Sequence, residues 1–246
     1  MNTAERFALF LFLLLALKSH GWVFSFRARR GSATTRNVSL KLSEKPWLSD
    51  RPLPKAIVFD LDGCLWRPEM YELLYFSGGA GAPFTPSDED PNVLLTKRGE
   101  PVQLLGNVRD VMRELHTDPK WEDTLICVSS RTDQPDWARE LLTKFQVQDT
   151  GSDHDGSSSF VLDDVFNGPR VLASDSKVQH FQRISKETGI SLEDMIFFDN
   201  EYGNCERVSE LGVTVGYCPN GVENEIWQAA LDSFPSRPGA IVSLGY

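Results

Sequence analysis

The chain has 246 residues, of which 41% are hydrophobic, and its 25 Lys and Arg against 35 Asp and Glu give a formal net charge of −10. This length suits one α/β domain with appendages or two small domains, and the apolar content excludes wholesale disorder. The acidic balance argues against binding to a nucleic-acid backbone, which requires clustered positive charge. A protein of this charge that handles phosphate must do so locally, with a metal ion or a few placed cations.

The charge is distributed unevenly along the chain. Residues 1–43 carry seven basic residues and one acid, so the remainder has 18 basic and 34 acidic residues. An apolar run over 7–17 is typical of the core of a secretory signal peptide, although a signal anchor is the other reading, and an Arg-, Ser- and Thr-rich segment follows it. We therefore predict a targeting presequence over residues 1–44 and a proline-marked linker over 45–54.

A signal peptide followed by a transit-like segment resembles the bipartite presequence of plastids acquired by secondary endosymbiosis. A plastid is the expected location, and the secretory pathway or secretion is the alternative. The four cysteines show no metal-binding or redox spacing and are expected to be packed, reduced thiols, which favours an organelle lumen. After processing, we expect no stable association with a membrane.

From residue 55 onward, apolar runs rich in β-formers alternate with stretches of helical period. Strands are expected at residues 56–59, 124–129, 171–173, 195–198 and 213–218. Between and after them, apolar stripes predict helices through Val108, Met112 and Leu115; Trp137, Leu141, Leu142 and Phe145; Val178, Phe181 and Ile184; Val208 and Leu211; and Ile226, Ala229 and Ala230. This order predicts one α/β domain over 55–246, with a three-layer, Rossmann-like parallel sheet and a site at the carboxyl ends of its strands.

Polar residues stand where the predicted strands end. Asp60 and Asp62 follow the first strand with their side chains on the same side, and Gly63 allows a tight turn beside them. Two adjacent carboxylates repel one another and call for a hard cation or a shared proton, although an Asp-rich turn is the bland alternative. Ser130 and Arg131 follow the second strand, and Asp199 and Asn200 follow the fourth.

Lys177 stands in the first turn of the helix between them. The order of acid pair, hydroxyl, lysine and acid resembles the four motifs of the haloacid dehalogenase-like phosphohydrolases. Within that superfamily, the stretches DLDGCLW, YELLYFSGGAGAPF, SSRT, SKVQHF, KETGI, MIFFDNE and LGVTV are similar to the eukaryotic magnesium-dependent phosphatase-1 family, over about residues 55–222. His180 follows Lys177 by three residues. We expect it to be a packing residue, and a role in orienting the helix that carries Lys177 is the alternative.

The resemblance implies an α/β core with almost no cap and Mg²⁺-dependent hydrolysis of phosphate monoesters. Asp60 would be the nucleophile and Asp62 the general acid and base, Ser130 would hydrogen-bond a phosphoryl oxygen, and Lys177 would neutralise the transferring group and hold the acids together. Arg131 is a candidate substrate contact for a second anionic group. The ligands of Mg²⁺ would be Asp60, Asp62 through its backbone carbonyl, and Asp199 or Asn200. Phosphotyrosine in proteins and phosphorylated sugar adducts such as fructosamine phosphates are the proposed substrates of such proteins.

This chain departs from the family pattern at two places. The family usually has two consecutive Asp where Asp199 and Asn200 stand, so one negative charge is absent here, and Cys64 has no functional interpretation. Residues 93–95 and 101–104 predict a β-hairpin flap in place of a cap, and Lys97 and Arg98 near its tip are candidate contacts for a second anionic group or plain surface cations. An open site of this kind tolerates phosphoproteins as well as small molecules.

The leading interpretation is a capless Mg²⁺-dependent phosphatase acting as a monomer on a phosphorylated small molecule or phosphoprotein. A catalytically idle phospho-ligand binder on the same fold is the alternative. A phosphotransferase or mutase is a third possibility, which the absence of a cap disfavours.

Overall fold

The computed structural model describes residues 52–76, 81–90, 92–148 and 159–245. All of them belong to the second of two units into which the chain divides, Ser49–Tyr246. The presequence over 1–44 and most of the linker over 45–54 lie outside the described residues and stay predictions. Within the described ranges, no helix combines the length and the apolar character needed to cross a bilayer.

A six-stranded parallel sheet forms the centre of the domain. Its strand order is β12-β11-β10-β1-β6-β9. The strands are β1 (Ala56–Phe59), β6 (Leu125–Ser130), β9 (Arg170–Leu172), β10 (Met195–Asp199), β11 (Thr214–Tyr217) and β12 (Ile241–Val242). Five of them match the predicted strands to within one residue at each end, and β12 was not predicted because two residues carry no period. After β1 the chain adds β6 and β9 on one side of this strand, and it then adds β10, β11 and β12 on the other side. The strand order therefore reverses beside β1, which is the switch point of the sheet.

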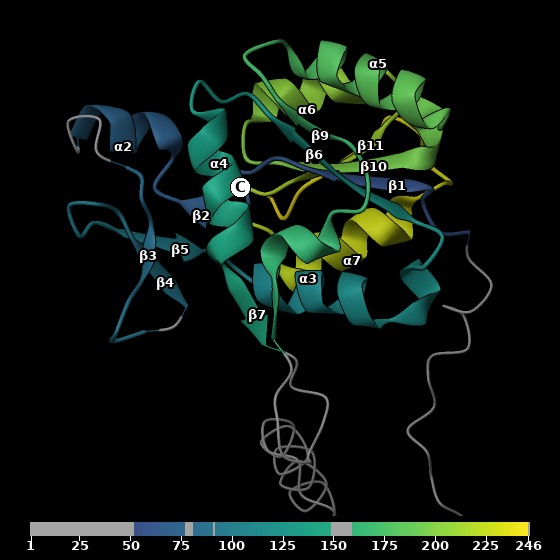
Figure 1. The fold of residues 1–246 in the computed structure, drawn as a ribbon. Helices are drawn as coiled ribbons and strands as arrows, with labels where there is room; N and C mark the ends of the chain where they lie inside the picture. The colour runs from purple at the N-terminus through teal and green to yellow at the C-terminus, as the bar shows by residue number, and fades with distance from the viewer. Residues whose placement is uncertain (1–51, 77–80, 91, 149–158, 246) are drawn as a thin grey trace, which may run out of the picture. The chain divides into compact units, whose positions relative to one another are not determined.

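Helices cover both faces of this sheet and complete the predicted three layers. Figure 1 shows α5 and α6 over one face and α3 and α7 over the other, with α4 towards the smaller lobe that contains α2. The helices are α3 (Val108–Thr117), α4 (Pro135–Lys144), α5 (Lys177–Thr188), α6 (Tyr202–Ser209) and α7 (Asn224–Ser233). The helix α6 ends two residues before Leu211, which lies outside it, contrary to the prediction.

The buried face of α5 differs from the predicted one. Val178 is only half-buried, whereas Lys177 and His180 are buried together with Phe181 and Ile184. The apolar pattern therefore predicted a buried face that is rotated by about one residue from the observed one. The reason is that α5 also buries two polar side chains, which an apolar pattern does not include. In α7, similarly, the buried residue beside Ile226 is Trp227, while Ala229 is half-buried.

Side-chain alternation divides the core into two layers. Ile57 and Phe59 of β1 belong to the cluster beneath α3 and α7, whereas Ala56 and Val58 belong to the cluster beneath α5 and α6. Because neighbouring residues of a strand point to opposite faces, the next position, Asp60, continues the row that faces α5 and α6. The same parity brings one polar residue of each central strand to this face at the carboxyl edge.

An aromatic stack fills the layer on the opposite face. Phe59 stacks on Phe198 with ring centroids 5.3 Å apart, and Phe198 lies 5.5 Å from Trp227. Trp227 in turn packs against Trp121 at 5.7 Å, and Glu114 accepts a hydrogen bond from each indole N–H. The buried polar atoms of both tryptophans are therefore satisfied, as a stable aromatic core requires.

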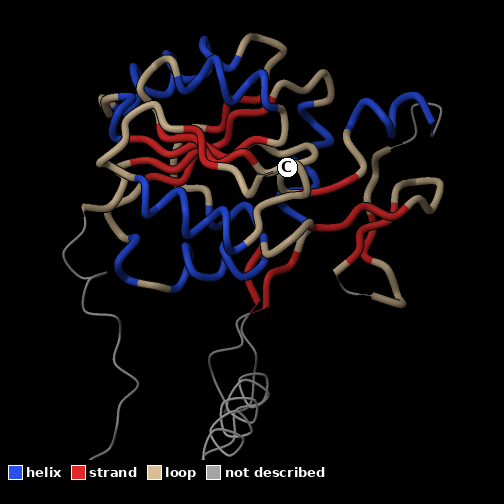
Figure 2. Tube along the Cα trace, turned by 180° about the vertical axis from the view of Figure 1, so that it is seen from behind, coloured by secondary structure: helices blue, strands red, loops and turns tan. Residues whose placement is uncertain are grey.

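The predicted hairpin flap is present, and it is part of a larger lobe. The strands β4 (Val93–Leu95) and β5 (Pro101–Leu104) pair antiparallel over the predicted residues. The structure adds β2 (Trp66–Arg67) and β3 (Thr85–Pro86), which complete a four-stranded sheet of order β2-β5-β4-β3, and the seven-residue helix α2 (Met70–Phe76). Figure 2 shows this lobe at the side of the central sheet. A separate pair, β7 (Gln146–Gln148) and β8 (Ser159–Val161), follows α4.

Two glycines with opposite surroundings give a test of this packing. A Cβ at Gly216 in β11 would lie 2.6 Å from the ring of Phe198, whereas a Cβ at Gly203 in α6 would meet only the end of Arg207 at 3.7 Å. We expect Gly216→Ala to lower the free energy of unfolding by about 1–3 kcal/mol, because the added methyl group overpacks the aromatic layer. Gly203→Ala is the matched control and should be neutral or stabilising, since alanine is favoured inside a helix. Chemical denaturation of both variants measures the difference, and equal effects would contradict the packing described here.

Candidate active site

Asp60 is the centre of the polar cluster at the carboxyl edge of the sheet. Its backbone N–H donates to the carbonyl of Phe198 at 2.9 Å, which extends the pairing of β1 with β10 by one residue. Its side chain is buried and accepts a hydrogen bond from the Lys177 ammonium at 2.7 Å. Burial raises the pKa of Asp60, the positive charge of Lys177 opposes this, and the nearby Asp62 adds to it.

Lys177 connects three segments of the chain that the sequence keeps far apart. Its ammonium donates to Asp60, lies 3.3 Å from Oδ2 of Asp199, and donates to the backbone carbonyl of Ser129. The side chain is 1% exposed, so these three acceptors replace the water that it loses. Burial alone would lower the pKa of Lys177, but the carboxylates of Asp60 and Asp199 outweigh burial, and the pKa is raised overall.

The first turn of α5 is fixed by its own cap. The Ser176 hydroxyl accepts a hydrogen bond from the backbone N–H of Gln179 at 3.3 Å, and the side chain of Gln179 accepts one from the N–H of Ser176 at 3.1 Å. This reciprocal pair is a capping box, which fixes where the helix begins. The position of Lys177, the first helical residue, follows from it.

Asp62 is held by donors from β2 and from the first residue of α2. The indole N–H of Trp66 donates to Oδ1 at 2.7 Å, and the backbone N–H of Met70 donates to Oδ2 at 3.2 Å. Burial raises the pKa of Asp62 to about 7, although both hydrogen bonds work against this. The hydrogen bond from Trp66 to this carboxylate is a contact that sequence reasoning missed.

Asp199 lies at the end of β10, fully buried, and its oxygens are shared among several donors. Oδ1 accepts from the backbone N–H of Glu201 at 2.7 Å, and the side-chain amide of Asn204 lies 3.2 Å from Oδ2. Burial raises the pKa of Asp199, and the positive charge of Lys177 opposes this. Asn204 of α6 was not among the predicted site residues. The signal that the sequence offers for it is its position three residues, or about one helical turn, after Glu201.

Asn200 packs against the turn after β1. Gly63 has φ of +72°, and a Cβ there would lie 2.3 Å from the amide nitrogen of Asn200. A residue with a side chain would therefore be strained at position 63 and would also displace Asn200. The prediction that this turn needs glycine is confirmed. One reason is that Gly63 of the first motif lies directly against Asn200 of the fourth motif.

Ser129 and His180 form a second polar pair on the same face. The Ser129 hydroxyl lies 3.0 Å from Nδ1 of His180, and both side chains are buried. Burial, together with the charge of Lys177, lowers the pKa of His180 to about 4, so the ring is neutral near pH 7. His180 therefore holds Ser129, whose backbone carbonyl accepts a hydrogen bond from Lys177. The histidine is packed in the interior, and through Ser129 it also acts on the position of the lysine.

The predicted catalytic residues converge on one pocket of about 130 Å³. Asp60, Asp62, Ser130, Arg131 and Lys177 all line it. Of the predicted metal ligands, Asp199 is buried behind Lys177 and Asn200 lies beside Gly63. Lys97 and Arg98 are exposed and do not line this pocket. Sequence reasoning missed part of the rim, which is formed by Glu69, Met70, Tyr71, Thr132, Asp133, Glu201 and Asn204.

The donor set at this edge fits a hard divalent cation. The side-chain oxygen of Asn200 is buried and has no hydrogen-bond partner among the described residues. Carboxylate, amide and backbone oxygens are the ligands that Mg²⁺ prefers. Within the described ranges, no group of three His, Cys, Asp or Glu could hold a metal by itself. A cation here therefore requires the amide of Asn200 or a backbone carbonyl in addition to the carboxylates.

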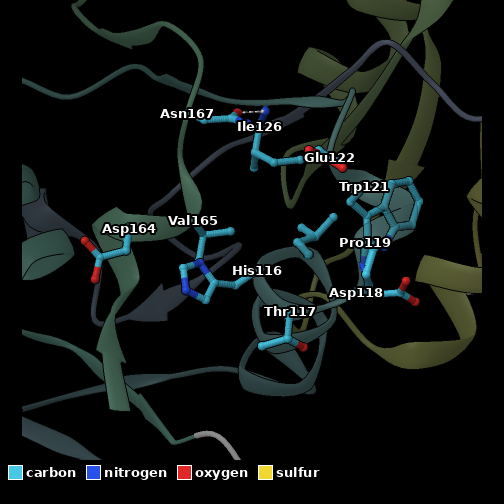
Figure 3. Close-up of a pocket in the computed structure, with 11 residues that line it drawn as sticks. His116, Thr117, Asp118, Pro119, Trp121, Glu122, Ile126, Asp164, Val165 and Asn167 are labelled. Carbon is cyan, nitrogen blue, oxygen red and sulfur yellow. Dashed lines mark hydrogen bonds between the residues drawn. The ribbon is translucent and has the colours of Figure 1, made fainter. Parts of the chain in front are cut away.

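A larger pocket of about 290 Å³ lies elsewhere and lacks this chemistry. It is bounded by the end of α3 and the segment before β9, and Figure 3 shows His116, Asp118, Asp164 and Asn167 around it. It reaches Ile126 near the start of β6, whereas Ser130 at the end of β6 lines the catalytic pocket. The two pockets therefore lie at opposite ends of the same strand. None of the predicted site residues lines the larger one.

A Rossmann-like sheet with this carboxylate, lysine and hydroxyl set at its carboxyl edge defines a phosphohydrolase of the haloacid dehalogenase-like class. The model of the Acid Phosphatase family matches residues 52–237 of the chain. The chain is 35% identical over 161 residues to a HAD-like hydrolase superfamily protein of Schizosaccharomyces pombe, covering 65% of this chain and 83% of that protein. It is 31% identical over 182 residues to Magnesium-dependent phosphatase 1 of Homo sapiens, covering 74% and 88%.

The chain therefore belongs to the acid phosphatase family of haloacid dehalogenase-like hydrolases, and it is a phosphatase. The family expected from the motifs is confirmed. Among solved structures, a HAD family enzyme of Bacteroides thetaiotaomicron in complex with magnesium and inorganic phosphate shares 16% identity, with a TM-score of 0.41 over 69% of this chain and 96% of that one.

The raised pKa of Asp62 predicts a pH-dependent stability of the metal-free protein. An acid whose pKa is about 7 in the folded state, against an ordinary value of 3.8, stabilises the fold at low pH, and this contribution is lost as the pH rises from about 4 through about 7. Asp62→Asn cannot ionise, so its melting temperature relative to wild type should rise between pH 5 and pH 8 in the presence of EDTA. Asp136→Asn, at an exposed position of α4, is the matched control for loss of one carboxylate. A difference between Asp62→Asn and wild type that stays constant with pH would contradict the shift.

Proposed function

We propose that the protein is a Mg²⁺-dependent phosphomonoester hydrolase that works through an aspartyl phosphate on Asp60. The observation that carries the proposal is the contact of Lys177 with Asp60 at 2.7 Å, in a pocket shared with Asp62 and Ser130. The lysine fixes one oxygen of the nucleophile and supplies a buried positive charge beside it. A phosphoryl group that enters this pocket meets a carboxylate, a hydroxyl and a cation at once.

In the first step, an oxygen of Asp60 attacks phosphorus and the bond from phosphorus to the ester oxygen breaks. Asp62 donates its proton to the leaving oxygen, a role that a pKa of about 7 suits because a large fraction of the acid is protonated near neutral pH. Lys177 stabilises the charge on the transferring group, and the hydroxyl of Ser130 and the guanidinium of Arg131 bind its oxygens.

In the second step, the now ionised Asp62 accepts a proton from the water that attacks the acyl phosphate. Phosphate leaves and Asp60 returns as a carboxylate. The N–H groups of Trp66 and Met70 keep Asp62 in one orientation through both steps. A fixed orientation matters because one group must serve as acid and then as base at the same place.

Mg²⁺, when bound, adds positive charge that shields the phosphate from the carboxylates. Asp60, Asp199 or Asn200, and the backbone carbonyl of Asp62 would hold it. This proposal is supported by the orphaned oxygen of Asn200 and by the human relative, which is named as magnesium-dependent.

The finer proposal concerns the substrate, which we infer to be a phosphotyrosine-type ester or a phosphorylated sugar adduct. A pocket of about 130 Å³ accommodates a phosphoryl group and little more, so the leaving group must lie in the open rim. Tyr71 of α2 is 50% exposed at this rim and offers an aromatic surface to that group. Both substrate types carry a leaving group that extends well beyond the phosphate.

Release of phosphate from p-nitrophenyl phosphate by the full chain tests the proposed reaction. We expect turnover with Mg²⁺ and a loss of at least about 100-fold with EDTA, because the uncompensated carboxylates then repel the substrate. Readdition of Mg²⁺ should restore the rate, which serves as the control for unfolding. Tight binding of phosphate without turnover in Mg²⁺ would favour the idle binding protein instead.

Substitution of the nucleophile should abolish turnover and leave the fold intact. Asp60→Asn cannot form an acyl phosphate, and it removes one of several crowded carboxylates, so the metal-free variant should melt no lower than wild type. Rates are measured with an aryl phosphate, and melting with EDTA present. A residual rate above about one hundredth of wild type, a loss of only ~2.7 kcal/mol of transition-state stabilisation, would show that Asp60 is not the nucleophile.

Asp62→Asn should fail at a different step. An activated leaving group such as nitrophenolate departs without a proton, so the aspartyl phosphate forms, but its hydrolysis lacks a base. Rapid-quench experiments should therefore show a burst of nitrophenolate close to one equivalent, followed by little turnover. Asp60→Asn is the control without a burst. Steady turnover without a burst in Asp62→Asn would remove Asp62 from the second step.

A further inference from the structure

Two buried thiols meet behind the catalytic carboxylates. Cys64 lies in the turn that follows β1, and Cys218 follows β11, 154 residues later in the chain. Their sulfur atoms are 3.5 Å apart, and both side chains are 0% exposed. Neither thiol lines the catalytic pocket, and the reaction as derived above uses neither of them.

Each of the two cysteines is tied to a residue of the site. Cys64 stands two positions after Asp62, and its sulfur lies 3.5 Å from the carbonyl of Phe198, the residue before Asp199. The backbone N–H of Cys218 donates to the carbonyl of Asp199 at 3.0 Å. If either cysteine moves, the turn that contains Asp62 or the end of β10 at Asp199 must therefore move with it.

We propose that Cys64 and Cys218 form a redox modification site, and that their oxidation to a disulfide lowers the phosphatase activity. A disulfide has a sulfur–sulfur distance of about 2.05 Å, so the two atoms must approach by about 1.5 Å. Backbone hydrogen bonds hold both sides of the turn: Cys64 N–H donates to Leu61, and Val222 N–H donates to the carbonyl of Cys64. A displacement of about 1 Å at a catalytic group costs on the order of 100-fold in rate.

The oxidant is a peroxide, which is small enough to reach a thiol during local opening. One sulfur attacks a peroxide oxygen: an S–O bond forms, the O–O bond breaks, and water leaves with the thiol proton. The second thiol attacks the sulfenic sulfur: the S–S bond forms, the S–O bond breaks, and a second water leaves. One peroxide is reduced to two waters, and two thiols are oxidised to one disulfide. Both thiols are 0% exposed, so peroxide reaches them only during local opening and the reaction is slow.

The other two cysteines provide matched controls. Cys127 lies in β6, and the sulfur of Cys205 lies 3.6 Å from the carbonyl of Asp199, and both are buried and free. In the part of the chain that the structure describes, neither Cys127 nor Cys205 makes a hydrogen bond to another sulfur. Cys205 is the sharper control, because it touches the same metal-site segment as Cys218.

The experiment treats the full chain with hydrogen peroxide, removes the excess with catalase, and measures hydrolysis of p-nitrophenyl phosphate in Mg²⁺. We expect a peptide that joins Cys64 to Cys218, a mass loss of about 2 Da for two hydrogens, and an activity loss of at least about tenfold. Dithiothreitol should restore the activity; because it does not reduce methionine sulfoxide, recovery assigns the loss to a thiol.

The variants decide which thiols act. Cys64→Ser and Cys218→Ser should keep their starting activity through the treatment, whereas Cys127→Ser and Cys205→Ser should lose it as wild type does. If Cys64→Ser starts with little activity, Cys218→Ser and the peptide map still decide. Absence of the joined peptide, full activity in the disulfide form, or equal sensitivity of Cys218→Ser and wild type would each overturn the proposal. The peptide map reads out the disulfide even where turnover on this substrate is absent.

Discussion

The site depends on one buried ammonium. Lys177 is shared between the carboxylates of Asp60 and Asp199, and it has no contact with bulk water to replace them. Loss of Lys177 would leave two buried carboxylates without their cation, and breaking a buried ion pair in this way typically costs about 3–5 kcal/mol. The first turn of α5 and the ends of β1 and β10 are therefore constrained by the same interaction. This constraint holds the carboxylate of Asp60, the proposed nucleophile, in place before any substrate arrives.

The strand ends could be predicted because their signal is local. Apolar runs that stop at Asp60, Ser130 and Asp199 specify where polar side chains emerge, and parallel strands bring them to one edge. The hairpin over 93–104 was also readable, since two short β-rich runs surround a turn. The family, the fold class and the convergence of five predicted residues on one pocket all followed from these signals.

The contacts that were missed depend on strand order, which no local pattern contains. Ser129 meets His180 because β6 is the neighbour of β1 in the sheet and α5 covers the face to which Ser129 points. Cys64 meets Cys218 because β11 lies two strands from β1 in the opposite direction along the sheet. Spacing rules for cysteines are local rules, so a pair 154 residues apart cannot satisfy them. The extra strands β2 and β3 were missed for a different reason: two residues are too few to show a period.

The pairing of Asp199 with Asn200 sets the charge that the site must balance. Asp60, Asp62 and Asp199 contribute three negative charges when ionised, and Lys177 contributes one positive charge. One divalent cation would balance the remaining two negative charges of these four residues, whereas an aspartate at position 200 would leave three. The amide of Asn200 also packs against Gly63, on the side of the turn where the carboxylate of Glu69 lies. The amide at position 200 would therefore keep an oxygen for the metal while adding no negative charge beside an entering anionic phosphate.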